Sequence, residues 1–108
     1  MDKALGYLSL SAKAGKLVCG ADNCVEVLKR GKARLLILAA DASPNACRRA
    51  DGMLFGRKVP LFRGGYTKYE LAAAAGANGP VAMAAMCDEG LAAAFARSAQ
   101  LNKQHEEE

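Results

Sequence analysis

The sequence has few of the side chains on which metal centres depend. Its single histidine, His105, lies in a run of polar and charged residues rather than in an apolar segment. The four cysteines, Cys19, Cys24, Cys47 and Cys87, follow no Cys-x-x-Cys spacing, so we expect no metal site and no cofactor. Cys47 and Cys87 lie among alanines and are expected to be buried, whereas Cys19 and Cys24 flank a polar turn and are expected to be more exposed.

The motifs of common catalytic sites are also missing. The chain has no Gly-x-Ser-x-Gly elbow, no Walker lysine motif and no histidine inside the folded part to act as a general base. The turn at residues 41–45 follows an apolar run but lacks the glycines that let a backbone approach a pyrophosphate. The sequence therefore favours a protein that is not an enzyme, and an enzyme acting on a small molecule is the minority hypothesis.

No apolar run approaches the roughly twenty residues that span a bilayer. The first sixteen residues are interrupted by Ser9, Ser11 and Lys13, which is unlike the continuous apolar core of a signal peptide. We expect a cytoplasmic protein that does not contact a membrane.

Aromatic residues are scarce at 6%, although hydrophobic residues make up 52% of the 108 residues. Alanine supplies much of this content, which suits helices packed closely against a sheet. The length fits one domain, expected over residues 1–99, with a charged tail over residues 100–108. The first 100 residues carry fourteen basic and eight acidic side chains, and a basic body of this kind is attracted to nucleic acid.

Helical and buried-strand patterns alternate along the chain. Residues 16–19 are compatible with either a short strand or an extended connector. The other expected elements are helices at about 2–14 and 22–31, a strand at 35–40, a helix from Ser43-Pro44, a short edge strand at 59–62, a capping-box helix from Thr67 to Gly76, a strand at 81–86 and a helix from Asp88 to about Ala99. This order predicts an α/β fold, a three-layer α/β/α sandwich with about four strands.

Two polar turns are candidate ligand sites. A helix start offers free amides and a positive dipole to phosphates or to guanine acceptor edges, and Gly20 would permit close approach at the first turn. In the alternative interpretation, Asp22 or Asn23 merely caps the helix, and Asp41 caps or orients the second turn.

The ordered series of segments resembles the ribosomal L7Ae and L30e type kink-turn RNA-binding family, with the short bacterial YlxQ-type members as the nearest likeness. The segments that carry the resemblance are residues 14–18, Gly20, the basic stretch 29–33, the apolar run 35–40, residues 41–44, Lys68-Tyr69-Glu70-Leu71, Ala75-Gly76 and residues 81–86. The resemblance covers about residues 4–97 and implies a three-layer fold with a mixed sheet.

The resemblance also implies an RNA-binding site of three elements. The family holds RNA with the first turn of the second helix, which contacts sheared G·A pairs, with the turn after the central strand, and with a loop that covers an extruded base. The matching residues here are Gly20, Ala21, Asp22, Asn23, Glu26 and Arg30 for the helix, Asp41 and Ala42 for the turn, and Asn78, Gly79, Pro80 and Val81 for the loop. Attraction to phosphates would come from Lys13, Lys16, Lys29, Arg30, Lys32 and Arg34.

The first element departs from the family pattern. Kink-turn binders usually present Gly-Thr-Asn-Glu and then, after two residues, Lys, whereas Glu26 occupies the lysine position here. Asn23 and Glu26 also have capping-box spacing, which predicts that Glu26 folds back onto the amides at the helix start. Both features predict weaker affinity for a standard kink-turn.

The leading hypothesis is therefore a monomeric, non-enzymatic RNA-binding protein of ribosomal type, whose partner is structured RNA, including ribosomal RNA or the ribosome. The alternative is a ribosome-associated or protein-interaction module that has kept the fold but lost kink-turn specificity.

Overall fold

The computed structural model describes the backbone of residues 2–106 and the side chains of residues 2–100. Helices and strands alternate through this part of the chain, as expected. In order they are α1 (Lys3–Lys13), β1 (Leu17–Cys19), α2 (Ala21–Lys29), β2 (Leu35–Leu38), α3 (Pro44–Leu54), β3 (Leu61–Arg63), α4 (Lys68–Ala75), β4 (Met83–Met86) and α5 (Glu89–Glu106). Residues 16–19, which were compatible with a short strand or an extended connector, contain strand β1.

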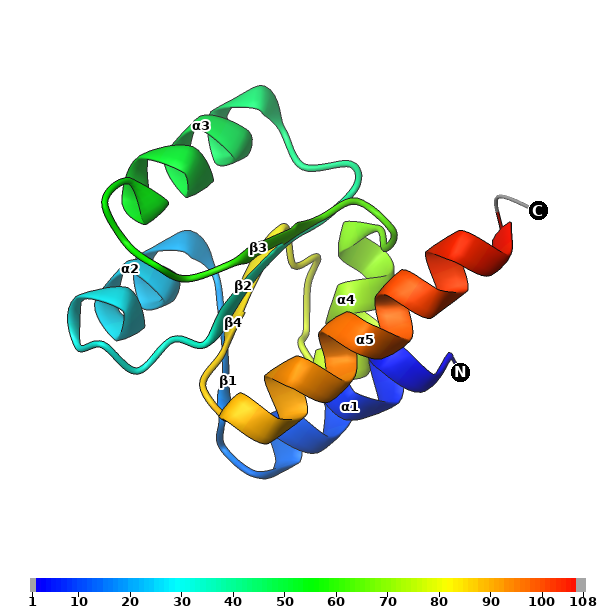
Figure 1. Cartoon of the computed structure of the whole chain (residues 1–108). Coiled ribbons are helices and arrows are strands. Elements are labelled where there is room, and N and C mark those ends of the chain that lie inside the picture. Colours follow the sequence, from blue (N-terminus) through cyan, green and yellow to red (C-terminus); the bar gives the residue numbers. More distant parts are fainter. Residues whose placement is uncertain (1, 107–108) are drawn as a thin grey trace.

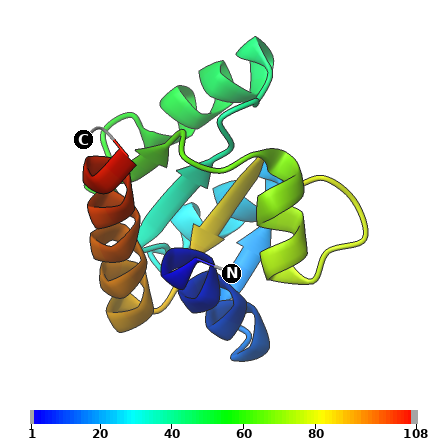
Figure 2. The same ribbon diagram turned by 90° about the vertical axis from the view of Figure 1, so that its right-hand side faces the viewer.

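The four strands form one mixed sheet in the order β1-β4-β2-β3. Strand β4 pairs antiparallel with both β1 and β2, and β2 pairs in parallel with β3. Strand β3 lies at the edge of the sheet, as predicted, but it spans Leu61–Arg63 and not residues 59–62, so Pro60 precedes the strand and takes part only through its carbonyl, which accepts from the Leu36 amide. Helices α1, α4 and α5 cover one face and α2 and α3 the other, which confirms the three-layer fold (Figures 1 and 2).

Strand β2 is buried at every position because it supplies both faces of the core. Leu35 and Ile37 pack with α1, α4 and α5, whereas Leu36 and Leu38 pack with α2 and α3. The few aromatic rings gather on the first face, where Phe95 is fully buried and its ring centroid lies 5.2 Å from that of Phe62.

The predicted helix caps are present where the signal is local. The Ser43 hydroxyl accepts from the Ala46 amide at 3.1 Å. Thr67 and Glu70 form both hydrogen bonds of the capping box, and Gly76 ends α4 in the left-handed conformation, with φ 70°. These features depend on neighbours three residues apart, which sequence spacing specifies directly.

Several boundaries differ from the expectation. Strand β2 ends at Leu38 because the Ala40 amide bonds to the Tyr66 carbonyl. Strand β4 begins at Met83 because the Val81 amide bonds to the Lys68 carbonyl, outside the sheet. Helix α5 continues to Glu106 instead of ending near Ala99, residues 107–108 lie outside the described part, and a separate tail stays a prediction. No described helix has the length and apolarity needed to cross a membrane.

The cysteine expectations were wrong for three residues. Cys24 is fully buried because it lies on the face of α2 that packs on the sheet, whereas Cys47 and Cys87 are only half-buried. Burial raises the pKa of the Cys24 thiol from 9.0 to about 12, and the neighbouring Cys19 and Cys87 add to the shift. Burial also raises the pKa of Cys19, which is half-buried.

We therefore expect Cys24 to be the last thiol modified when the folded protein is treated with iodoacetamide at pH 8. The thiolate is the nucleophile, and Cys24 has neither solvent access nor a populated thiolate at that pH. Mass spectrometry of timed samples would show half-buried Cys47 modified before Cys24. In urea, the modification rates of Cys47 and Cys24 should become equal. Equal rates in the folded protein would contradict the burial of Cys24.

Candidate nucleic-acid interface

Three of the segments singled out in the sequence meet at one end of the sheet, beside the ends of its strands. The Gly20 amide donates to the Met83 carbonyl at 2.9 Å, and the Ala39 amide donates to the Ala82 carbonyl at 2.8 Å. The start of α2 and the end of β2 therefore flank the start of β4. We call the surface formed by residues 20–23, 41–42 and 78–81 the polar edge.

Helix α2 begins earlier than expected, and its cap is Gly20. Gly20 has φ 93° and ψ 148° and makes no side-chain cap hydrogen bond. Asp22 instead accepts from the Arg49 Nη2 at 3.0 Å, and the Asn23 amide group donates to the Cys19 carbonyl at 2.9 Å. The interpretation that either side chain caps the helix was wrong, and the first amides of α2 carry its positive dipole with no side chain of this helix capping them.

The predicted capping box of Asn23 and Glu26 is also absent. Because α2 begins at Ala21, Asn23 is already its third residue and Glu26 lies one turn further along, beyond the free amides. Glu26 Oε1 instead accepts from Arg30 Nε at 3.0 Å. Both side chains are more than half exposed, so this pair contributes no more than about 1 kcal/mol and can open.

Asp41 ties the second segment to the start of α4. Its Oδ1 accepts from the Lys68 amide at 2.8 Å, so Asp41 orients its turn by capping the first residue of a distant helix, as the structural alternative suggested. The Lys68 carbonyl in turn accepts from the Val81 amide at 2.9 Å. The first turn of α4 therefore lies between the two other segments and belongs to the same surface.

Sequence reasoning missed two side chains that this linkage brings to the polar edge. Lys68 has its Nζ 5.6 Å from the centroid of the Tyr69 ring, and Tyr69 is 64% exposed. An exposed aromatic residue in the first turn of a capped helix was the available signal, but only the fold places that turn beside Asp41.

A hollow of about 450 Å³ lies between the start of α2 and the loop before β4. Small residues line most of it, including Gly20, Ala21, Ala46 and Gly79. In Figure 2 the same loop extends outward between α4 and β4. Gly79, Pro80 and Val81 line the hollow, whereas Asn78 is exposed outside it and Ala42 packs towards the core.

The structure does not bring the other candidate cations to this edge. The Lys16 carbonyl accepts from the Cys87 amide, and the Arg34 amide donates to the Met86 carbonyl, so both residues lie at the far end of β4, about 10 Å away. Lys29 ends α2, about 12 Å along its axis from Ala21 at the helix start. Lys13 ends α1, Arg30 is the C-cap of α2, and Lys32 lies in the loop that follows.

No group of three or more His, Cys, Asp or Glu side chains within the described residues is arranged to hold a metal ion.

The layers, the strand order and the polar edge define a three-layer α/β/α protein with a mixed four-stranded sheet. The chain belongs to the ribosomal protein L7Ae/L30e/S12e/Gadd45 family, whose model matches residues 2–96.

Two solved structures share the fold at low sequence identity. A protein of unknown function from Bacillus halodurans has a TM-score of 0.84 and 24% identity, over 93% of this chain and 99% of that one. The 15.5 kD RNA-binding protein of Giardia lamblia has a TM-score of 0.73 and 24% identity, over 89% and 81% of the two chains. A comparison with curated protein sequences finds no significant match.

Replacing Gly20 by alanine should lower the free energy of unfolding by about 1–3 kcal/mol, because its backbone conformation is one that side chains rarely adopt. Beyond Gly20 and its two chain neighbours, no heavy atom lies within 4 Å of the added methyl group, so the cost is conformational and not steric. Urea denaturation followed by circular dichroism would measure it.

Gly52 in α3 provides the matched control. It has no positive φ and equally open surroundings, so Gly52→Ala should stabilise the protein by about 0.5–1 kcal/mol. Equal effects of the two substitutions would contradict the conformation of Gly20.

Proposed function

We propose that this protein binds structured RNA of the kink-turn type through the polar edge and carries out no chemistry on it. The observation that carries the proposal is the start of α2, a helix without a side-chain cap, which adjoins the turn after β2 and the loop before β4 in a chain of a ribosomal-protein family. We infer a monomer that acts in the cytoplasm, in translation, on ribosomal RNA or another structured RNA.

The amides of residues 21–23 are suited to acceptor groups of RNA. The first amides of a helix have no partner inside it, and the helix dipole favours a negative ligand at this end. Guanine edges and phosphate oxygens are such acceptors. In this role Gly20 permits close approach of the RNA, because no side chain covers the helix start.

The hollow beside these amides is suited to an unstacked base. Its walls are glycine backbone and mostly small side chains of alanine, proline and valine, with Cys19 and Met83, which offer an apolar surface and leave room. Bases turned out of an RNA helix are recognised by stacking on rings and by hydrogen bonds to their edges, so the hollow supplies apolar contact and Tyr69 in the adjoining turn of α4 supplies the ring. Asn78 and Asn23 are exposed near it and supply donors and acceptors.

Tyr69 and Lys68 extend the proposed site by one turn of α4. An exposed tyrosine ring stacks on a base of any type, and Lys68 beside it provides a cation for the adjoining phosphate. The name of the Giardia protein with the same fold, an RNA-binding protein, supports the proposal.

The acidic side chains lower the RNA affinity of this site but do not prevent binding. Asp22 is paired with Arg49 and Glu26 with Arg30, so their charges are partly neutralised. The exposed pairs are weak, and Arg49, which is held at the start of α2 by Asp22, can turn to a phosphate when RNA approaches.

Fluorescence titration against a kink-turn RNA and a straight duplex of equal length tests the proposal. We expect the kink-turn to bind at least tenfold more tightly at 0.1 M salt. Tyr69→Ala should weaken kink-turn binding by about 1–3 kcal/mol, the usual loss of one stacked base, while Tyr69→Phe keeps the ring and the affinity. Equally weak binding to both RNAs would instead favour a ribosome-associated or protein-interaction module without kink-turn specificity.

The charge at Glu26 gives a second prediction. Glu26→Lys replaces a repulsive charge by an attractive one beside the proposed RNA path, and it should strengthen kink-turn binding by about 0.5–1 kcal/mol, or roughly twofold to fivefold. Asp51→Lys is the control, because it makes the same charge change on α3, where Asp51 pairs with Arg63, outside the polar edge. If both variants strengthen binding equally, the effect is one of net charge and the assignment of Glu26 fails.

A further inference from the structure

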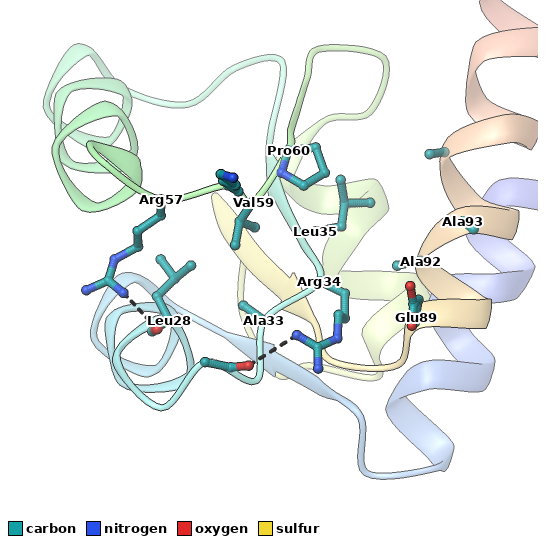
Figure 3. Close-up of a pocket in the computed structure, with 13 residues that line it drawn as sticks. Leu28, Ala33, Arg34, Leu35, Arg57, Val59, Pro60, Glu89, Ala92 and Ala93 are labelled. Atoms are coloured by element: carbon teal, nitrogen blue, oxygen red, sulfur yellow. Dashed lines mark hydrogen bonds between the residues drawn. The ribbon is translucent and has the colours of Figure 1, made fainter.

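A second and larger cavity lies at the opposite end of the sheet from the polar edge. Its volume is about 640 Å³, and it is lined by residues from three ranges, 28–35, 57–60 and 89–96. These ranges are the end of α2 with the start of β2, the segment before β3, and the first turns of α5 (Figure 3). A neighbouring hollow of about 440 Å³ shares Leu35, Pro60 and Ala96 with it and continues beside β3 to Arg63. We call the two together the basic groove.

The charge of the larger cavity is mostly positive. Arg34, Arg57 and Lys58 line it, and Glu89 on α5 is the one acidic side chain among its described lining residues. The polar edge has no comparable excess of positive charge, because Asp22 and Asp41 lie there. The family resemblance assigns no ligand to the groove.

The two arginines are held in position by main-chain carbonyls. Arg57 donates from Nη1 to the Leu28 carbonyl at 3.0 Å and from Nε to the Met53 carbonyl at 3.2 Å. Arg34 donates from Nη1 to the Gly31 carbonyl at 3.1 Å, and Figure 3 shows both side chains directed to the end of α2. A guanidinium group has five N–H donors, so each arginine keeps donors for a ligand after its orientation is set.

The remaining walls are aliphatic. Leu28, Leu35, Val59, Pro60 and the α5 alanines supply them, and no aromatic ring lines the larger cavity. A site for single-stranded RNA needs rings on which bases stack, whereas the one ring among the described residues that line the groove, Phe62, packs edge-on against Phe95 in the core. Planar guanidinium groups pair well with carboxylates, and aliphatic walls accept aliphatic side chains, so these features favour a peptide over RNA.

We propose that the basic groove binds a segment of a protein partner in which aspartate or glutamate side chains alternate with leucine, isoleucine or valine. Carboxylates of the segment pair with Arg34 and Arg57, and its aliphatic side chains pack on Leu35 and Val59. The groove and the polar edge lie at opposite ends of β4, so a partner in the groove leaves the polar edge accessible.

Site-specific photo-crosslinking in the full chain tests this inference. A benzophenone amino acid is placed at Ala93, which is exposed and lines the groove, or at Ala73, which is exposed on α4. The variants are expressed in the organism from which the gene comes, the cells are irradiated, and the lysate is treated with nuclease. We then expect a protein adduct from position 93 and none from position 73. The crosslinked segment, mapped by mass spectrometry, should carry acidic and aliphatic residues together.

Charge variants of the peptide and of the groove then distinguish the proposed pairing from an incidental contact. A synthetic peptide of the mapped segment should bind the full chain at least tenfold more tightly than the same peptide with Gln and Asn in place of Glu and Asp. Arg34→Gln should weaken it comparably at an unchanged melting temperature, whereas Glu89→Gln should strengthen it. No adduct at position 93, an adduct with RNA alone, or binding indifferent to these charges would overturn the inference.

The result of the crosslinking experiment at the groove does not depend on RNA binding at the polar edge. Tyr69→Ala should leave the position 93 adduct unchanged, so failure of the groove and failure of the polar edge are observed separately.

Discussion

The antiparallel pairing of β2 with β4 determines where every candidate site of this protein lies. Leu38 faces Met83 at one end of the pair and Leu35 faces Met86 at the other. All eight residues of the two strands are buried, so a shift of register by one residue would turn each apolar side chain to the wrong layer. The register therefore fixes which loops share an end of the sheet, and it separates the polar edge from the basic groove.

At the polar edge, the loops are joined by main-chain contacts more than by side-chain packing. Asp41 holds the first turn of α4, and the Lys68 carbonyl holds the loop before β4. The start of α2 is joined to the same strand through the Gly20 amide. These links fix the helix amides and small residues relative to one another, which would lower the entropy lost on binding the proposed RNA. They also explain why an acidic residue belongs at Asp41, where its carboxylate is used internally.

Local patterns in the sequence were enough to predict much of the fold. The continuous apolar run at 35–40 indicated a strand covered on both faces, Pro60 indicated an edge strand, and the Thr67 capping box indicated the start of α4. Each depends on residues within one element, where spacing and chemistry act directly. The resemblance to a known family supplied the mixed sheet and the three elements of the candidate site.

The wrong predictions concern features that depend on contacts between distant parts of the chain. Gly20 caps α2 because its amide is held by Met83, and this contact moved the helix start by one residue and left Glu26 beyond the free amides. Lys16 and Lys29 are near Gly20 in the sequence, but the strand and the helix carry them away from it. The basic groove combines Arg34, Arg57 and Glu89, which no short pattern connects.

We propose that RNA is held at the polar edge, although most of the candidate cations lie towards the other end of the sheet. Amide chemical-shift mapping of the ¹⁵N-labelled protein during titration with a kink-turn RNA tests it most directly. We expect the largest shifts at residues 21–23, 68–69, Gly79 and Val81, with small ones at Lys16, Arg34 and residues 57–59. Shifts confined to Lys16, Arg34 and residues 57–59 would show that RNA binds elsewhere.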